Sequence, residues 1–223
     1  MMAQTNILDF RAPVNETADQ ALRGVWKDFI GSIAGIGKGI YHSDREMSSV
    51  LSHNLVLVHS LLMNTSQYRG LVNSSFRRLT RTKNWGWKAI YEDALGKAGL
   101  FSIYRNAPVP LHDHPGTRGA LMVVEGEVEV ERFTLKEEYR QRNESGMVEL
   151  QRCDKKVLKP FDITWFGPET GNVHGMRALT DQCVMLKVQL LQMKADRSWY
   201  FPVFSVEQGQ EMLSARRIVS RYL

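Results

Sequence analysis

Two short histidine-bearing stretches constrain this chain more than any other feature of its sequence. The first reads Pro-Leu-His-Asp-His-Pro-Gly over residues 110–116, and the second reads Gly-Asn-Val-His-Gly over residues 171–175. Alternate side chains of a β-strand share a face, so His112 and His114 project together. Two imidazoles on an inward face suit an apolar core poorly unless they bind something, and a metal ion is the usual partner. We therefore predict a metal site with the ligands His112, His114 and His174, over the alternative of two surface histidines and an unrelated buried one.

The composition is that of a globular, mildly basic protein. The 223 residues suit one domain of generous size, or one domain with an appended module, and 43% of them are hydrophobic. The formal net charge of +5 does not by itself indicate nucleic-acid binding. The densest basic run lies within residues 77–88 and includes Trp85 and Trp87. We interpret this run as the solvated face of a helix with its tryptophans turned inward, and we expect no nucleic-acid partner.

The cysteine content and residues 1–15 indicate the cellular compartment of the protein. Only two cysteines occur, Cys153 and Cys183, which form no disulfide framework and suit a reducing compartment. Residues 1–15 lack a basic start followed by an apolar core and a cleavage site. The most apolar run, residues 55–63, is far shorter than a membrane span. These features predict a soluble, cytoplasmic protein without a membrane partner.

Helical periodicity dominates the first part of the chain. Apolar residues recur at intervals of three and four in residues 16–33. Ser43 and Glu46 are spaced as in a capping box, which predicts the start of a second helix. A third helical stretch spans about residues 66–81. We therefore predict an N-terminal helical region over residues 1–98.

Strand-like sequence follows, and the chain then returns to helical spacing. Residues 99–206 contain many short alternating segments and turns, including a hairpin at Glu125-Gly126, which predict a β-barrel. Residues 207–223 have apolar positions at helical spacing and predict a C-terminal helix. No linker separates the helical region from the strands, so we expect the helices to pack against the barrel.

The order of these features resembles the cupin double-stranded β-helix. Cupins combine a His-x-His segment, a glycine turn such as Gly126, and a Gly-x-x-His segment opening a later strand. The usual first cupin motif also has a glutamate shortly beyond its second histidine, where this chain has Arg118 and Gly119. Three neutral imidazoles would leave a divalent metal its full charge and open positions for an anionic substrate and dioxygen. The resemblance implies a mainly β fold, a jelly-roll barrel with the N-terminal helical region packed on it.

A cupin with three histidines and no glutamate is the arrangement associated with the thiol dioxygenases. Residues 101–103 and 109–116 resemble a strand and the Pro-Leu-His-Asn-His-Pro-Gly segment of plant cysteine oxidases and cysteamine dioxygenase. Residues 171–174 and 178–180 resemble the Gly-Asn-Ile-His segment and its Ala-Ile/Leu-Thr continuation in that family. The resemblance covers roughly residues 100–204. It implies Fe(II)- and O2-dependent oxidation of a small thiol, either cysteine-like or a mercaptocarboxylate, to its sulfinic acid.

Four residues are candidates to act around the metal. Where the family carries an aspartate thought to meet the substrate's amine, this chain has Lys187, which repels an ammonium group and attracts a carboxylate. An acidic thiol fits best if Lys187 faces the cavity rather than outward. Arg118 could hold a substrate carboxylate or lie at the rim, and Tyr200 could place a hydroxyl beside the metal or fill the barrel. Asn172, next to His174, is a candidate to orient a ligand ring.

Two other functions remain open on the sequence. A three-histidine cupin can hold zinc, nickel or manganese and act as a hydrolase, an isomerase or a ring-cleaving oxygenase. Alternatively, the metal could anchor a ligand without turnover, in a sensor whose helical region contacts a partner. The expected partners of the leading interpretation are a small thiol and O2, and a homodimer is one expectation because cupins often pair through a sheet face.

Overall fold

The computed structural model is mainly β, as expected. It describes residues 27–29, 31, 35, 49, 52–56, 59, 85–92, 96–105, 107–115, 117–136, 144–166, 173–191, 197–203 and 212–220. The helical residues among them all precede residue 60. The described strands, in chain order, are β1 Trp85–Glu92, β2 Gly96–Tyr104, β3 Val109–His112, β4 Thr117–Glu125, β5 Val128–Leu135, β6 Gly146–Leu158, β7 Ile163–Phe166, β8 Val173–Ala178, β9 Gln182–Leu191, β10 Arg197–Pro202 and β11 Met212–Ser220.

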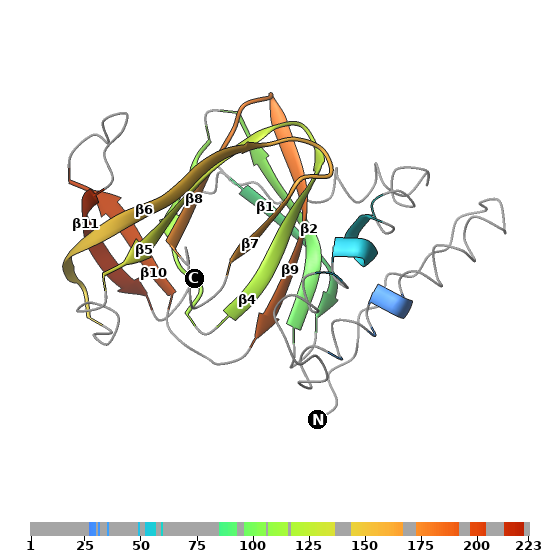
Figure 1. The fold of residues 1–223 in the computed structure, drawn as a ribbon, viewed down its shortest axis with the longest axis horizontal. Coiled ribbons are helices and arrows are strands. Elements are labelled where there is room, and N and C mark those ends of the chain that lie inside the picture. The colour runs from blue at the N-terminus through green and yellow to red at the C-terminus, as the bar shows by residue number, and fades with distance from the viewer. Residues whose placement is uncertain are drawn as a thin grey trace, which may run out of the picture.

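The strands form two antiparallel sheets (Figure 1), and the main core lies between them. The first sheet has five strands in the order β1-β2-β9-β4-β7, and the second closes into a six-stranded barrel in the order β10-β11-β6-β5-β8-β3. The main core takes buried residues from both sheets, including Phe101 and Met185 from the first and Val130 and Met176 from the second. A smaller cluster around Phe133 lies among β5, β6, β8, β10 and β11 of the closed barrel.

Strand β9 is buried on both faces, which explains its almost continuous apolar sequence. Cys183 and Met185 belong to the core between the sheets, and Lys187 follows at the next position on that face. The intervening Val184 and Leu186 are fully buried on the opposite face. Burial raises the pKa of Cys183 to about 12, so this thiol stays protonated as a small core side chain.

The helical residues lie beside the outer face of the first sheet (Figure 1). Phe29 and Leu55, two of these helical residues, are fully buried. The Nε2 atom of His59 donates to the carbonyl oxygen of Val124 at 3.1 Å, and its ring packs edge-on against Phe161 at 4.1 Å between centroids. Burial lowers the pKa of His59 and so favours the neutral ring, although the hydrogen bond to Val124 acts in the raising direction. Among the described residues, no helix has the length and hydropathy needed to span a membrane.

The predicted C-terminal helix over residues 207–223 is wrong. Residues 212–220 form β11, which pairs with β10 on one side and β6 on the other. The buried positions are Leu213, Ala215 and Arg217, a period of two that the apolar residues alone do not reveal. The segment becomes a strand because two partner strands satisfy its backbone groups, which local periodicity cannot indicate.

The predicted boundary at residue 98 is also wrong, because it falls inside β2. Residues 85–92, assigned to the helical region, form β1 and pair with β2. Trp85 and Trp87 do turn inward and pack against the main core, although from a strand rather than a helix. The helix start predicted at residues 43–46 and the stretch 66–81 lie outside the described residues.

The turn at Glu125-Gly126 is present, but it does not join a hairpin. It carries the chain from β4, which pairs with β7 and β9, to β5, which pairs with β6 and β8 in the other sheet. Gly126 has φ +81°, and a Cβ there would lie 2.3 Å from the carbonyl oxygen of Gln182. The hydroxyl of Thr180 accepts from the backbone N–H of Glu127 at 3.0 Å, which braces the crossing.

Gly126→Ala is expected to lower the free energy of unfolding by about 2–4 kcal/mol, because it combines a left-handed backbone with a steric clash. Urea denaturation measures this change. Gly146→Ala is the matched control, since nothing lies within 4 Å of a Cβ added there. The control is expected to change stability by less than about 1 kcal/mol, and equal effects in both variants would contradict the role of the turn.

Candidate metal centre

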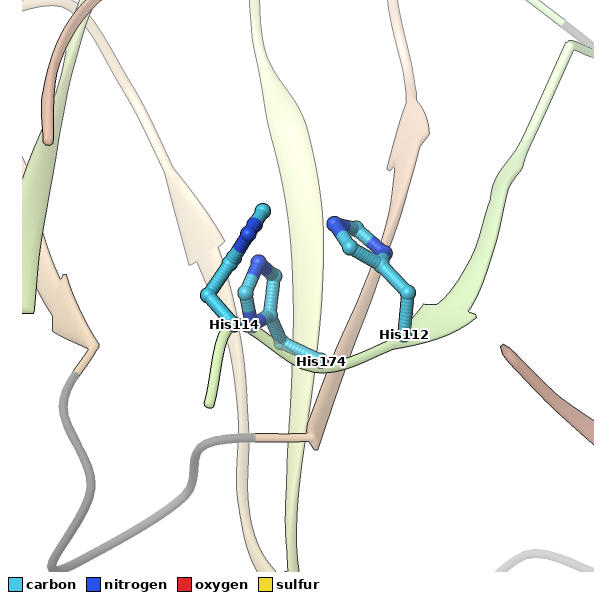
Figure 2. A group of neighbouring side chains, drawn as sticks. All are labelled: His112, His114 and His174. Carbon is cyan, nitrogen blue, oxygen red and sulfur yellow. The ribbon is translucent and has the colours of Figure 1, made fainter. Parts of the chain in front are cut away.

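Antiparallel pairing of β3 with β8 places the two histidine segments side by side. His112 ends β3 and is the register partner of His174 in β8, while His114 follows two residues later. The ring centroid of His112 lies 4.9 Å from that of His114 and 4.5 Å from that of His174. Each ring offers one nitrogen, and the three nitrogens all lie within 4.8 Å of one another. All three side chains are buried, and Figure 2 shows their rings gathered around one point.

Neighbouring groups hold the histidine rings in place. The Nδ1 atom of His112 lies 2.8 Å from the carbonyl oxygen of Pro110. A carbonyl oxygen only accepts, so Nδ1 carries the proton and Nε2 is left with its lone pair for a metal. The indole ring of Trp199 lies 5.2 Å from the ring of His112 between centroids. The ring of Phe166 lies 5.3 Å from those of both His114 and His174.

The residue between the two β3 histidines is anchored to β10. The carboxylate of Asp113 accepts from the backbone N–H of Ser198 at 2.7 Å and from the Tyr200 hydroxyl at 2.8 Å. Its own backbone N–H donates to the carbonyl oxygen of Ser198 at 3.1 Å. Arg217 in turn donates to the Ser198 hydroxyl at 3.0 Å. Burial, followed by the nearby Asp113 charge, raises the pKa of Tyr200, so its hydroxyl stays protonated and donates.

Lys187 reaches the histidines from the opposite sheet. Its Nζ lies 3.4 Å from Nε2 of His114. The same ammonium group lies 5.3 Å from the ring centroid of Phe166 and 5.6 Å from that of Phe101, within cation–π range. The residue is 7% exposed. Lys187 therefore faces the interior and the histidine group rather than solvent, while its role toward a substrate stays a prediction.

An aromatic ring fills the space beside the position where the cupin motif has its acid. Gly119 is the register partner of Phe166. A Cβ added at Gly119 would lie 2.2 Å from Cζ of Phe166 and 2.4 Å from the carbonyl oxygen of Val188. The glycine thus allows the ring of Phe166 to lie against the histidines. Packing therefore also disfavours an acidic side chain at residue 119, because a longer side chain would displace the ring of Phe166.

Of the remaining candidate residues, the structure describes the side chain of Tyr200 but not those of Arg118 and Asn172. Arg118 lies in β4 in register with Leu190, but its side chain lies outside the described residues, as does Asn172. Their predicted roles stay predictions. The ring of Tyr200 belongs to the smaller core cluster, and its hydroxyl donates to Asp113. A role of the Tyr200 hydroxyl in the reaction stays a prediction.

Sequence reasoning missed Trp199, the β10 residue that contacts a predicted ligand. The register pairs Trp199 with His112 and Tyr200 with Leu111. The indole of Trp199 also lies 5.9 Å from that of Trp85 in β1, so it connects the two sheets next to the histidines. Strand alternation does require Trp199 and Tyr200 to face opposite sides. It does not indicate which of them faces the site, because that depends on the pairing with β3.

The histidine group fits a transition-metal ion. Imidazole nitrogen is a suitable ligand for iron, zinc, copper and nickel. The group that the described residues form consists of three buried histidines and no carboxylate. Together, the two sheets and this group have the features of a cupin double-stranded β-helix with three buried histidines as a candidate metal site.

A comparison with known protein families identifies the family of this chain. The family model PCO_ADO matches residues 51–208, more than half of the sequence. The chain therefore belongs to the plant cysteine oxidase and cysteamine dioxygenase family, a family of thiol dioxygenases. The match extends further toward the N-terminus than the resemblance seen in the sequence. No curated protein matches significantly.

Several solved structures share a distant likeness in fold. A protein with a double-stranded β-helix domain from Klebsiella pneumoniae has a TM-score of 0.38 at 16% identity, covering 52% of this chain and 83% of its own. The cupin domain of Cnp3 from Schizosaccharomyces pombe has a TM-score of 0.37 at 12% identity, covering 53% and 72%. KdgF from a Halomonas species has a TM-score of 0.37 at 19% identity, covering 50% and 83%. Likeness of this degree carries no information about the chemistry of the site.

His112→Ala and His174→Ala are each expected to abolish retention of stoichiometric metal, because two imidazoles alone bind a divalent ion weakly. The fold is expected to remain largely intact. Metal content per protein after reconstitution and dialysis, with circular dichroism for folding, measures both effects. His53→Ala, in an exposed helical position, is the matched control and should retain metal. Stoichiometric metal in either site variant would remove that residue from the ligand set.

Tyr200→Phe is expected to destabilise the protein by about 1–3 kcal/mol, because it leaves the buried Asp113 carboxylate short of one donor. Metal content should stay stoichiometric, since the hydroxyl donates to Asp113 and is not one of the predicted ligands. Urea denaturation and metal analysis measure the two effects. Unchanged stability together with loss of turnover would instead place the hydroxyl in the reaction.

Proposed function

We propose that this protein is an Fe(II)- and O2-dependent dioxygenase that oxidises a small thiol to its sulfinic acid. The observation that carries the proposal is the buried group of three histidines without a carboxylate, in a chain of the thiol dioxygenase family. The proposal names the metal as iron and the substrate as a thiol. The family and the donor set support them together.

The neutral donor set favours an anionic sulfur ligand. Three imidazoles contribute no negative charge, so a divalent ion keeps its full charge and attracts a thiolate strongly. A carboxylate ligand would offset part of that charge. A carboxylate ligand at residue 119 is disfavoured, because a side chain longer than that of glycine would collide with the ring of Phe166.

Bound iron would supply a site at which a thiolate and dioxygen meet. The residues of the chain supply position and shielding. Hydrogen bonding to Pro110 sets the tautomer of His112, and Asp113 anchors the segment that carries two of the ligands. The rings of Phe166 and Trp199 border the histidines and exclude water from the reacting sulfur.

The proposed reaction balances without another reductant. One thiol and one O2 give one sulfinic acid, and both oxygen atoms form bonds to sulfur while the O–O bond breaks. Sulfur supplies the four electrons that O2 accepts. The thiol proton leaves when the thiolate forms and returns to solvent or to the sulfinate.

Iron-loaded protein is expected to consume one O2 per thiol and to yield sulfinate with both atoms derived from labelled O2. The panel comprises cysteine, cysteamine, 3-mercaptopropionate and a peptide with an N-terminal cysteine, with an oxygen electrode and mass spectrometry as readouts. Zinc-loaded protein is the matched control and should consume no O2.

The same panel separates the alternatives. Iron-loaded protein that consumes no O2 with any of these thiols would contradict the dioxygenase. Tight metal binding with no turnover would favour the sensor, and a strong preference for zinc, nickel or manganese in metal competition would favour another metal-dependent reaction.

A further inference from the structure

We propose that Lys187 binds a carboxylate of the substrate, which makes the substrate a small acidic thiol such as a mercaptocarboxylate. This inference rests on the proposed thiol oxidation and adds the chemical class of the thiol. It starts from the position of the buried Lys187 side chain, whose Nζ lies 3.4 Å from Nε2 of His114.

The backbone of β9 directs Lys187 into the site. Lys187 pairs with Leu121 of β4 on one side and with Gly99 of β2 on the other, so it occupies the middle of the first sheet. Cys183 and Met185 precede it on the same face and lie in the core between the sheets. The side chain therefore extends from one sheet across the interior toward the histidines on the other, and Nζ comes to 3.4 Å from His114.

The surroundings of the Lys187 side chain favour a charged partner over water. The residue is 7% exposed, and the rings of Phe101 and Phe166 border Nζ at 5.6 and 5.3 Å. Water screens charges poorly in such a place, so a carboxylate gains more from the ammonium group than it would at the surface. Hydrogen bonds between charged groups are also roughly twice as strong as neutral ones.

Charge balance separates acidic thiols from aminothiols. The three imidazoles are neutral, so a divalent metal at the histidines and a protonated Lys187 would together carry three positive charges. A mercaptocarboxylate bound as thiolate and carboxylate brings two negative charges to this pair. An aminothiol brings its ammonium group next to that of Lys187, and like charges at close range are unfavourable.

Asp113, the acid next to the ligands in the sequence, does not reverse this balance. Its carboxylate is held by the backbone of Ser198 and the hydroxyl of Tyr200. Tyr200 belongs to the smaller core cluster, away from the core between the sheets. Asp113 thus faces β10, whereas Lys187 faces the histidine rings.

The distance to His114 indicates a small substrate. The ammonium group and the metal position share the ring of His114 as a neighbour, so one molecule must contact both across a short gap. A thiol whose sulfur and carboxylate are separated by one or two methylene groups meets this requirement. Cysteine-initiated peptides place their first carboxylate far from sulfur and do not.

Three thiols of matched length test the inference: 3-mercaptopropionate, 1-propanethiol and cysteamine differ only in an acidic, neutral or amino end. They are compared on iron-loaded wild type, Lys187→Met and Lys187→Arg. Lys159→Met, which removes a lysine that is 68% exposed in its side chain at the turn after β6, is the matched control. Turnover is measured as kcat/KM from O2 uptake. Binding is measured separately and anaerobically, from thiolate-to-cobalt absorption of the Co(II)-substituted protein.

Wild type is expected to prefer the acid over the neutral thiol, and the neutral thiol over the amine. Lys187→Met should lower kcat/KM and affinity for the acid by roughly 10–100-fold relative to the neutral thiol, the range of a charge-assisted hydrogen bond. Lys187→Arg should keep much of the preference, and Lys159→Met all of it. A wild type that prefers cysteamine, or a Lys187→Met variant that weakens all three thiols equally, would overturn the inference.

The binding measurement separates this inference from the proposed reaction. Acid-selective binding that is lost in Lys187→Met, without O2 uptake by the iron form, would retain the carboxylate site and reject the dioxygenase. O2 uptake with all three thiols and no effect of Lys187→Met on their ranking would retain the dioxygenase and reject the carboxylate site.

Discussion

The pairing of β3 with both β8 and β10 is the constraint on which the site depends. β3 is only four residues long, yet it closes the six-stranded barrel by joining these two strands. Pairing with β8 sets His112 opposite His174, and pairing with β10 sets Trp199 against His112. Three hydrogen bonds between Asp113 and residues 198 and 200 continue that attachment past the end of the strand. The histidines are therefore positioned by backbone pairing and by the hydrogen bonds of the residue between two of them.

The opposite wall of the site comes from the first sheet and differs in chemistry. It contributes Lys187, a buried lysine, and Phe166, an aromatic ring that lies beside Gly119. Gly119 makes this possible because the ring of Phe166 occupies the space that a side chain there would need. The centre is thus positive and apolar on one side and rich in neutral nitrogen donors on the other. An anionic sulfur compound is the kind of ligand that benefits from both walls.

Several features could be predicted because they depend on local pattern. The shared face of His112 and His114 and the turn at Gly126 follow from alternation or from the special geometry of one residue. Trp85 and Trp87 turn inward as predicted, but from β1 and not from the predicted helix. The errors arise where partners distant in sequence decide the outcome. Residues 212–220 have apolar spacing that suits a helix but become β11 because β10 and β6 lie on either side. The segment before Gly126 does not pair with the segment after it, because each finds its partners in a different sheet.

The sequence alone determined the class of protein and its candidate metal ligands, because three histidines in two strand-like segments are costly to bury without a metal and match one family closely. It also placed a lysine where the family has an acid. Only the tertiary structure decided that this lysine faces the histidines, that Trp199 rather than Tyr200 borders them, and that Phe166 fills the space beside Gly119. These outcomes depend on register between distant strands, such as the pairing of His112 with Trp199, which alternation within a single strand leaves undetermined.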